Sequence, residues 1–160
     1  MLAVVLLASL GVVVWPRLAN ALGIEPSRPA PAYVAGDRVD VPAAWYQRAP
    51  RTLILFARAS CGACQTAQPF LRSLASTVLE HGAAVIVAGH RETVAEDAAF
   101  ARSLGLGDDA FVPFPAGLRV RVTPTLVLVD RTGAILHAWE AVGPPDRQQA
   151  IARAVTAALK

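Results

Sequence analysis

Cysteine, methionine and lysine are the residues that this chain has least of. Its 160 residues include two cysteines and one methionine, and the single lysine is the last residue, Lys160. Two cysteines cannot build a framework of several disulfides. A four-ligand zinc site is also disfavoured, because no second cysteine pair exists and His81, His90 and His137 are scattered. We therefore expect no metal site and no cofactor.

Runs of like charge are also missing. The formal net charge is only +3, and the arginines are spread along the whole chain. Nucleic-acid-binding proteins gather basic residues into a patch or stripe, so we expect no nucleic-acid partner. The chain is 54% hydrophobic and is not of low complexity. This composition excludes a disordered protein and predicts one packed domain with room for an N-terminal segment.

The first residues form a long stretch without charge. No charged residue occurs from Leu2 to Trp15, and Arg17 is the only charged residue of the window 2–24. A bilayer requires roughly 20 apolar residues, which the whole window supplies. Our first interpretation of residues 1–24 is an uncleaved signal anchor. The second is a signal peptide, because Ala19-Asn20-Ala21 fits the small-x-small cleavage pattern. A buried helix is the third interpretation, and either of the first two exports the domain.

A proline-rich linker and one domain follow. Three prolines lie between Glu25 and Pro31, so residues 25–32 are predicted to be an extended spacer. The domain is predicted to span 33–160, with Trp45 and Tyr46 in its core and a short edge strand or hairpin before residue 50. Hydrophobic periodicity then predicts these elements in order: a strand at 52–57, a helix at 62–80 with Pro69 inside it, a strand at 83–88, a helix at 93–104, a loop at 107–117, a hairpin of strands at 126–129 and 134–139, and a helix at 146–159.

This order predicts the fold class. Strands that alternate with helices and end in a hairpin indicate an α/β domain with a central mixed β-sheet and helices on both faces. At the start of the second helix, Thr93 and Glu96 have the spacing of a capping box.

The two cysteines form a C-x-x-C motif where the first strand meets the first helix. The amides of a helix's first turn have no partner inside the helix, and the helix dipole is positive there. Both effects favour a thiolate, so Cys61 is predicted to be the nucleophile and Cys64 the thiol that resolves a mixed disulfide. Gly62 and Ala63 between them carry no charge, so we expect moderate activation. A structural disulfide and half of a metal site are the alternatives, but so short a loop would constrain little chain entropy.

Residues around the pair are weaker candidates for the site. Arg58 could help to hold the thiolate ionised, although a side chain at such a position more often points to solvent. Ser60 could donate a weak hydrogen bond to sulfur, and we favour a neutral role for it. Further along, Thr123 and Pro124 stand at the head of a predicted strand. A proline there suggests a cis peptide bond.

These motifs resemble the thioredoxin superfamily and, within it, the exported TlpA/ResA-like thiol–disulfide oxidoreductases. The resemblance covers about residues 33–160. It rests on the C-x-x-C segment, on Pro69 five residues later, and on the Val122-Thr123-Pro124-Thr125 strand start. It implies that Pro124 is cis and lies against the cysteines, that the Thr123 backbone pairs with the substrate chain, and that the helix at 93–104 is the family's central insertion.

The chain departs from the family pattern at three positions. Ser60 stands where the family usually has tryptophan, and Leu55 and Ala67 stand where some members carry a buried acid. No carboxylate is therefore identified that would take the proton from Cys64.

The resemblance implies an enzyme that exchanges dithiols and disulfides with protein partners in the cell envelope. We expect a monomeric reductant of the cytochrome c maturation type, supplied by a membrane electron donor and held to the membrane by residues 2–24 if these stay uncleaved. Two other hypotheses remain. One is a non-enzymatic accessory module that uses the Thr123–Pro124 groove to bind a partner, and the lesser one is a peroxide-reducing enzyme.

Overall fold

The computed structural model describes residues 32–160. The interpretations of residues 1–24, and the linker apart from Ala32, lie outside the described residues. Within the described range, no helix combines the length and apolarity needed to cross a membrane.

The domain is built on one mixed sheet of five strands. Its order is β3-β2-β1-β4-β5, with β1 parallel to β2 and antiparallel to β4. The strands are β1 (Arg51–Phe56), β2 (Ala84–Gly89), β3 (Phe111–Pro113), β4 (Thr125–Asp130) and β5 (Ile135–Glu140). β1, β2 and β4 are buried on both faces, which fits the continuous apolar runs of their sequences.

The three α-helices of residues 32–160 pack on one face of this sheet. They are α2 (Gly62–Glu80), α3 (Val94–Ser103) and α4 (Pro145–Ala158). The buried side chains of all three join Leu53, Leu55 and Leu128 in one hydrophobic cluster. Parallel crossovers are right-handed, and the connections β1-α2-β2 and β2-α3-β3 step the same way across the sheet. Two such steps place α2 and α3 on the same side.

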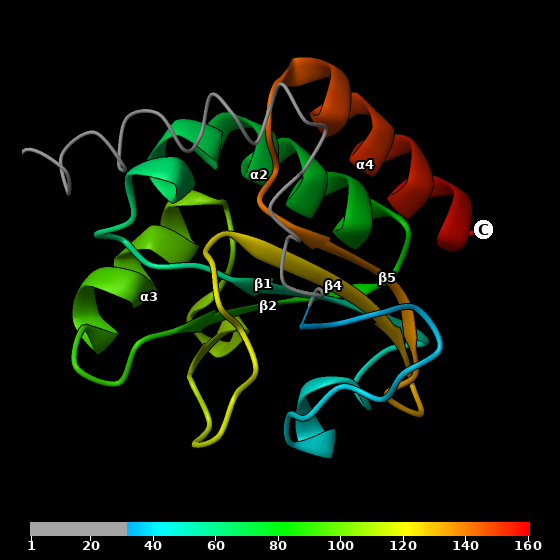
Figure 1. Ribbon diagram of the computed structural model, residues 1–160, viewed down its shortest axis with the longest axis horizontal. Helices are drawn as coiled ribbons and strands as arrows, with labels where there is room; N and C mark the ends of the chain where they lie inside the picture. Colours follow the sequence, from blue (N-terminus) through cyan, green and yellow to red (C-terminus); the bar gives the residue numbers. More distant parts are fainter. Residues whose placement is uncertain (1–31) are drawn as a thin grey trace, which may run out of the picture. The chain divides into compact units, whose positions relative to one another are not determined.

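The second face has a different cover. Ile54, Phe56 and Val127 point to it from the strands, and they pack against residues 32–46 and the segment 112–120. Figure 1 shows α2 and α4 above the sheet, with the blue-to-cyan N-terminal part of the domain and the yellow loop after β3 below it. Helices were predicted on both faces. This is corrected for the second face, to which residues 32–160 contribute only the short 3-10 helix η1 (Ala43–Trp45).

The N-terminal part of the domain is held by polar contacts as well as by burial. Trp45 and Tyr46 are buried, as expected. The Tyr33 ring stacks on Phe56 at 5.7 Å between centroids, and its hydroxyl donates to Asp40 at 2.5 Å. Burial and this hydrogen bond raise the pKa of Tyr33. In place of the predicted edge strand or hairpin, residues 33–50 form η1 and a bridge of Arg38 with Ala134.

Two further local predictions are wrong. The predicted loop 107–117 contains the 3-10 helix η2 (Asp108–Ala110) and the edge strand β3. The Thr93–Glu96 capping box does not form, because the Thr93 hydroxyl donates to Asp97 at 2.9 Å.

Candidate active site

Cys61 lies at the N-cap of α2, as predicted. β1 ends at Phe56, and a short turn closed by the Cys61 amide on the Arg58 carbonyl leads into the helix. The Cys61 sulfur accepts a hydrogen bond from the Cys64 amide, at 3.3 Å. This amide belongs to the first helical turn, whose donors have no partner within the helix. The sulfur therefore occupies the place that a serine or aspartate oxygen fills at most helix N-caps.

The two thiols differ in exposure and in acidity. Both cysteines are free, with Cys61 partly exposed and Cys64 at 0% exposure. Burial raises the pKa of Cys64 to about 12, and the hydrogen bond with Cys61 adds to the effect. Cys64 is therefore held as a neutral thiol.

Opposing influences act on the pKa of Cys61. Partial burial raises it, but hydrogen bonds from the Cys64 and Thr123 side chains and from the backbone of Cys64 and Ala63 lower it. The hydrogen bonds outweigh burial, so the pKa of Cys61 lies below its ordinary value. The groups that donate these hydrogen bonds are neutral, so the thiolate is stabilised by dipoles and not by a charged side chain.

The Thr123–Pro124 segment lies directly against the nucleophile. Its peptide bond is cis, as predicted. The Cys61 thiol donates to the Thr123 carbonyl oxygen at 3.3 Å. The sheet register explains this proximity, because Phe56 at the end of β1 pairs with Thr125 at the start of β4. The loops that leave these two strand ends must meet at the same edge.

Asp97 is a site residue that the sequence analysis missed. It lies in the first turn of α3 and is only 1% exposed. Its Oδ1 accepts a hydrogen bond from the Ala59 amide at 2.6 Å, and its Oδ2 accepts one from the His90 amide at 2.7 Å. Ala59 is also held by its carbonyl, which accepts from the Gln65 side chain at 2.7 Å. The turn before Cys61 is thus fixed at both backbone polar groups of one residue.

Two sequence signals could have revealed Asp97. It lies in phase with the buried Phe100, Ala101 and Leu104 at spacings of three, four and seven residues, so its carboxylate falls on the apolar stripe of the helix. In addition, a side chain at Gly89 would meet the Cβ and Oδ2 of Asp97 at 2.7 Å. The glycine leaves room for the carboxylate.

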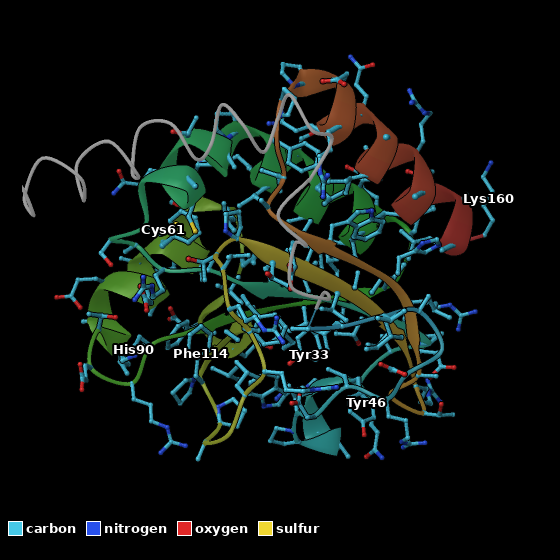
Figure 2. The ribbon with its side chains drawn as sticks, viewed as in Figure 1. Tyr33, Tyr46, Cys61, His90, Phe114 and Lys160 are labelled. Carbon is cyan, nitrogen blue, oxygen red and sulfur yellow. The ribbon has the colours of Figure 1, made fainter. Side chains whose placement is uncertain are left out.

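The other residues that were considered around the site differ in exposure. Arg58, Ser60, Gly62 and Ala63 are exposed around the cysteines. Leu55 and Ala67 are buried, in line with their apolar side chains. His90 does reach the site region, where its ring lies edge-on to Phe114 at 6.1 Å. Figure 2 shows these two side chains below Cys61. Within residues 32–160, no group of histidine, cysteine and carboxylate side chains could hold a metal ion.

Comparison with known proteins identifies the fold. No protein-family model matches the sequence, and no curated protein sequence is significantly similar to it. A thioredoxin-family thiol:disulfide interchange protein from Chlorobium tepidum aligns with a TM-score of 0.54 at 18% identity, over 85% of this chain and 100% of its own. A secreted Mycobacterium tuberculosis disulfide oxidoreductase homologous to E. coli DsbE aligns with a TM-score of 0.52 at 16% identity, over 72% of this chain and 85% of its own. MTB DsbF aligns with a TM-score of 0.53 at 17% identity, over 81% of this chain and 98% of its own.

At these identities the similarity shows the fold. The predicted thioredoxin-like α/β fold is confirmed.

Proposed function

We propose that this protein is a thiol–disulfide oxidoreductase that exchanges dithiols and disulfides with protein partners. One observation carries the proposal. The C-x-x-C thiols differ in the way that exchange requires, with a partly exposed sulfur of lowered pKa at Cys61 and a buried sulfur of raised pKa at Cys64. Three structural neighbours that are described as disulfide-exchanging or redox-active proteins support it as analogies of fold.

Reduction of a partner would proceed in two displacements. The Cys61 thiolate attacks one sulfur of the partner disulfide, that S–S bond breaks, and the released thiolate takes a proton from solvent. Cys64 then gives up its proton and attacks the Cys61 sulfur. The second partner thiolate leaves, and the Cys61–Cys64 disulfide forms. Two electrons pass from the protein to the partner.

We infer that the protein acts as a reductant. Strong oxidants of this fold owe their potential to a highly stabilised nucleophilic thiolate. Here neutral groups donate the hydrogen bonds that lower the pKa of Cys61, and no lysine, arginine or histidine lies between the two cysteines. The dithiol is therefore less favoured than in a strong oxidant, and electrons are given up more readily.

The location follows from the N-terminal sequence. The uncharged stretch from Leu2 to Trp15 supports export to the cell envelope, and the neighbour from M. tuberculosis is described as secreted. A reductant there needs a supply of electrons from across the membrane. Reduction of apocytochrome c cysteines would be one case of such a reaction.

The reduction potential of the cysteine pair tests the proposal. We expect a reversible two-electron couple close to that of thioredoxin, about −270 mV, and far from about −120 mV. Insulin reduction should be lost in Cys61→Ser, and turnover by that variant at the wild-type rate would contradict the assignment. A chain with no reversible couple would instead be a non-enzymatic binding module. Rapid peroxide consumption with a stable sulfenate at Cys61 would favour the peroxide-reducing alternative.

A further inference from the structure

A groove of about 880 Å³ runs away from the nucleophile on the side of Thr123. Three segments line it: the active-site turn at Arg58, the β2–α3 turn at residues 90–92, and the chain from residue 114 to 123. Thr123 belongs both to this groove and to the contact with Cys61, because its carbonyl oxygen lies 3.3 Å from the sulfur. A polypeptide whose cysteine reacts at Cys61 therefore has the groove directly beside it.

Apolar side chains and backbone provide part of the lining. Phe114, Leu118 and Val120 line the groove and also pack against the cluster on the second face of the sheet. Val122, next to Thr123, is 44% exposed. Firmly packed residues next to an exposed valine suit an extended chain with small or apolar side chains at some positions.

The charges of the groove are mostly positive. Its lining contains three arginines, Arg58, Arg91 and Arg121, and one carboxylate, Glu92. All four side chains are exposed. The Nε of Arg91 donates to the Phe114 carbonyl at 2.7 Å, which uses one of its five N–H donors. Glu92 lies 3.9 Å from the Nδ1 of His90, and the three guanidinium groups of the lining outnumber this single carboxylate.

We propose that the groove selects partner proteins that carry acidic residues next to the reactive cysteine. This inference rests on the proposed function and names the partner class for it. Guanidinium groups pair with carboxylates through charge-assisted hydrogen bonds. Groups of like sign on a groove wall also raise the encounter rate with an oppositely charged chain, in a manner that falls with salt.

The test uses three matched peptides with one disulfide each, flanked by acidic, neutral or basic residues. The full chain is reduced beforehand, and the second-order rate constant of peptide reduction is measured. We expect the acidic peptide to react about three- to tenfold faster than the neutral one at low salt, from two or three exposed charge pairs. The basic peptide should be slowest, and about 0.5 M salt should remove most of the difference.

Paired variants show whether the groove is responsible. Arg91→Gln with Arg121→Gln should abolish the preference for the acidic peptide. Arg131→Gln with Arg153→Gln makes the same change of net charge at exposed positions outside the groove, and should preserve the preference. Equal rates for the three peptides, or a preference that survives the groove variant, would overturn the inference.

A binding measurement separates this inference from the proposed function. An acidic peptide whose cysteines are replaced by serine cannot react, so its fluorescence anisotropy reports binding alone. Tighter binding to the wild type than to the groove variant supports the inference, even if none of the disulfide peptides is reduced and the proposed function fails. If an oligonucleotide of the same charge displaces the peptide as well as an acidic competitor peptide does, the groove binds any anion without selectivity. This result would overturn the inference.

Discussion

The buried carboxylate of Asp97 and the backbone amide of Ala59 form a hydrogen bond of 2.6 Å that joins helix α3 to the turn before Cys61. The same carboxylate also accepts from His90 and Thr93. Its three donors come from two different segments of the site. The helix that the sequence analysis identified as an insertion therefore positions the active-site turn.

Replacing Asp97 by asparagine should loosen this turn. The variant keeps the shape of the side chain but places an NH₂ group opposite backbone donors. Hydrogen bonds to a charged group contribute about 1.5–3 kcal/mol, and we expect the free energy of unfolding in urea to fall by about that amount. Amide hydrogen exchange at Ala59 should also become faster.

The neighbouring residue provides a matched control for Asp97→Asn. Glu96 lies in the same helical turn but is exposed. Glu96→Gln makes the same change of charge, and it should change stability by less than about 0.5 kcal/mol. Equal effects of the two substitutions would mean that the Asp97 contacts contribute little.

A methyl group at Gly89 should disturb the same carboxylate. In Gly89→Ala the new Cβ would lie 2.7 Å from Asp97 and 2.8 Å from the Phe111 ring. Overpacking of this kind costs about 1–3 kcal/mol. At Gly62, in contrast, an added Cβ has nothing within 4 Å, so Gly62→Ala should be neutral or stabilise the helix by up to about 1 kcal/mol. Thermal melts of the two variants compare these effects, and a Gly89→Ala protein as stable as the wild type would contradict the close packing.

The reactivity of the thiols should depend on pH in two separate ranges. The pKa of Cys61 is lowered, so its thiolate fraction rises with pH and should be half-maximal at a lower pH than for an ordinary cysteine thiol. The pKa of Cys64 is about 12, so this thiol should stay protonated across the range in which Cys61 ionises. Alkylation by iodoacetamide, followed by peptide mapping, measures both. Faster labelling of Cys64 than of Cys61 at neutral pH would reverse the assignment of roles.

Removing Cys64 should weaken the activation of Cys61. The side-chain hydrogen bond from Cys64 lowers the pKa of Cys61, and Cys64→Ala deletes this donor while leaving the backbone amide in place. The alkylation curve of Cys61 should therefore move to higher pH. The variant should also accumulate mixed disulfides, since no second thiol is present to resolve them. An unchanged curve would mean that the backbone amides alone set the acidity of Cys61.

In residues 32–160, one buried hydroxyl lacks a hydrogen-bond partner, and we expect its removal to stabilise the protein. Thr52 in β1 is 0% exposed, and within the described residues its Oγ1 has no hydrogen-bond partner. Thr52→Val should therefore raise the free energy of unfolding by about 1 kcal/mol. Thr125 is the control, because its equally buried hydroxyl donates to the Val122 carbonyl at 2.8 Å. Thr125→Val should lower stability by about 1 kcal/mol, and a loss of stability in both variants would contradict this account of Thr52.

The sequence predicted those parts of the molecule that depend on local patterns. A strand that leads into a helix at Cys61 places the sulfur at unpaired amides wherever the rest of the chain lies. The helix 62–80, the buried central strands and the cis bond at Thr123–Pro124 likewise follow from spacing, periodicity or a motif. They need no knowledge of distant contacts.

The parts that could not be predicted depend on contacts between distant segments. Asp97 has the appearance of an ordinary acid in the first turn of a helix, where the dipole favours it, and only the position of Ala59, 38 residues earlier, gives it a partner. β3 is three residues long and ends in proline, so it has no alternating pattern to detect. The sequence of the chain on the second face shows no helical or strand periodicity. Single side chains such as Tyr33 and Phe114 anchor this chain to the sheet.

The two faces of the sheet are covered differently, and this difference affects which substitutions can alter the choice of partner. The larger hydrophobic cluster lies on the face that α2, α3 and α4 cover, whereas much of the groove that we propose for partner binding consists of the irregular chain between β3 and β4. Substitutions in residues 115–122 can therefore alter the choice of partner without repacking a helix. The redox chemistry at Cys61 would then stay the same while the choice of partner protein changes.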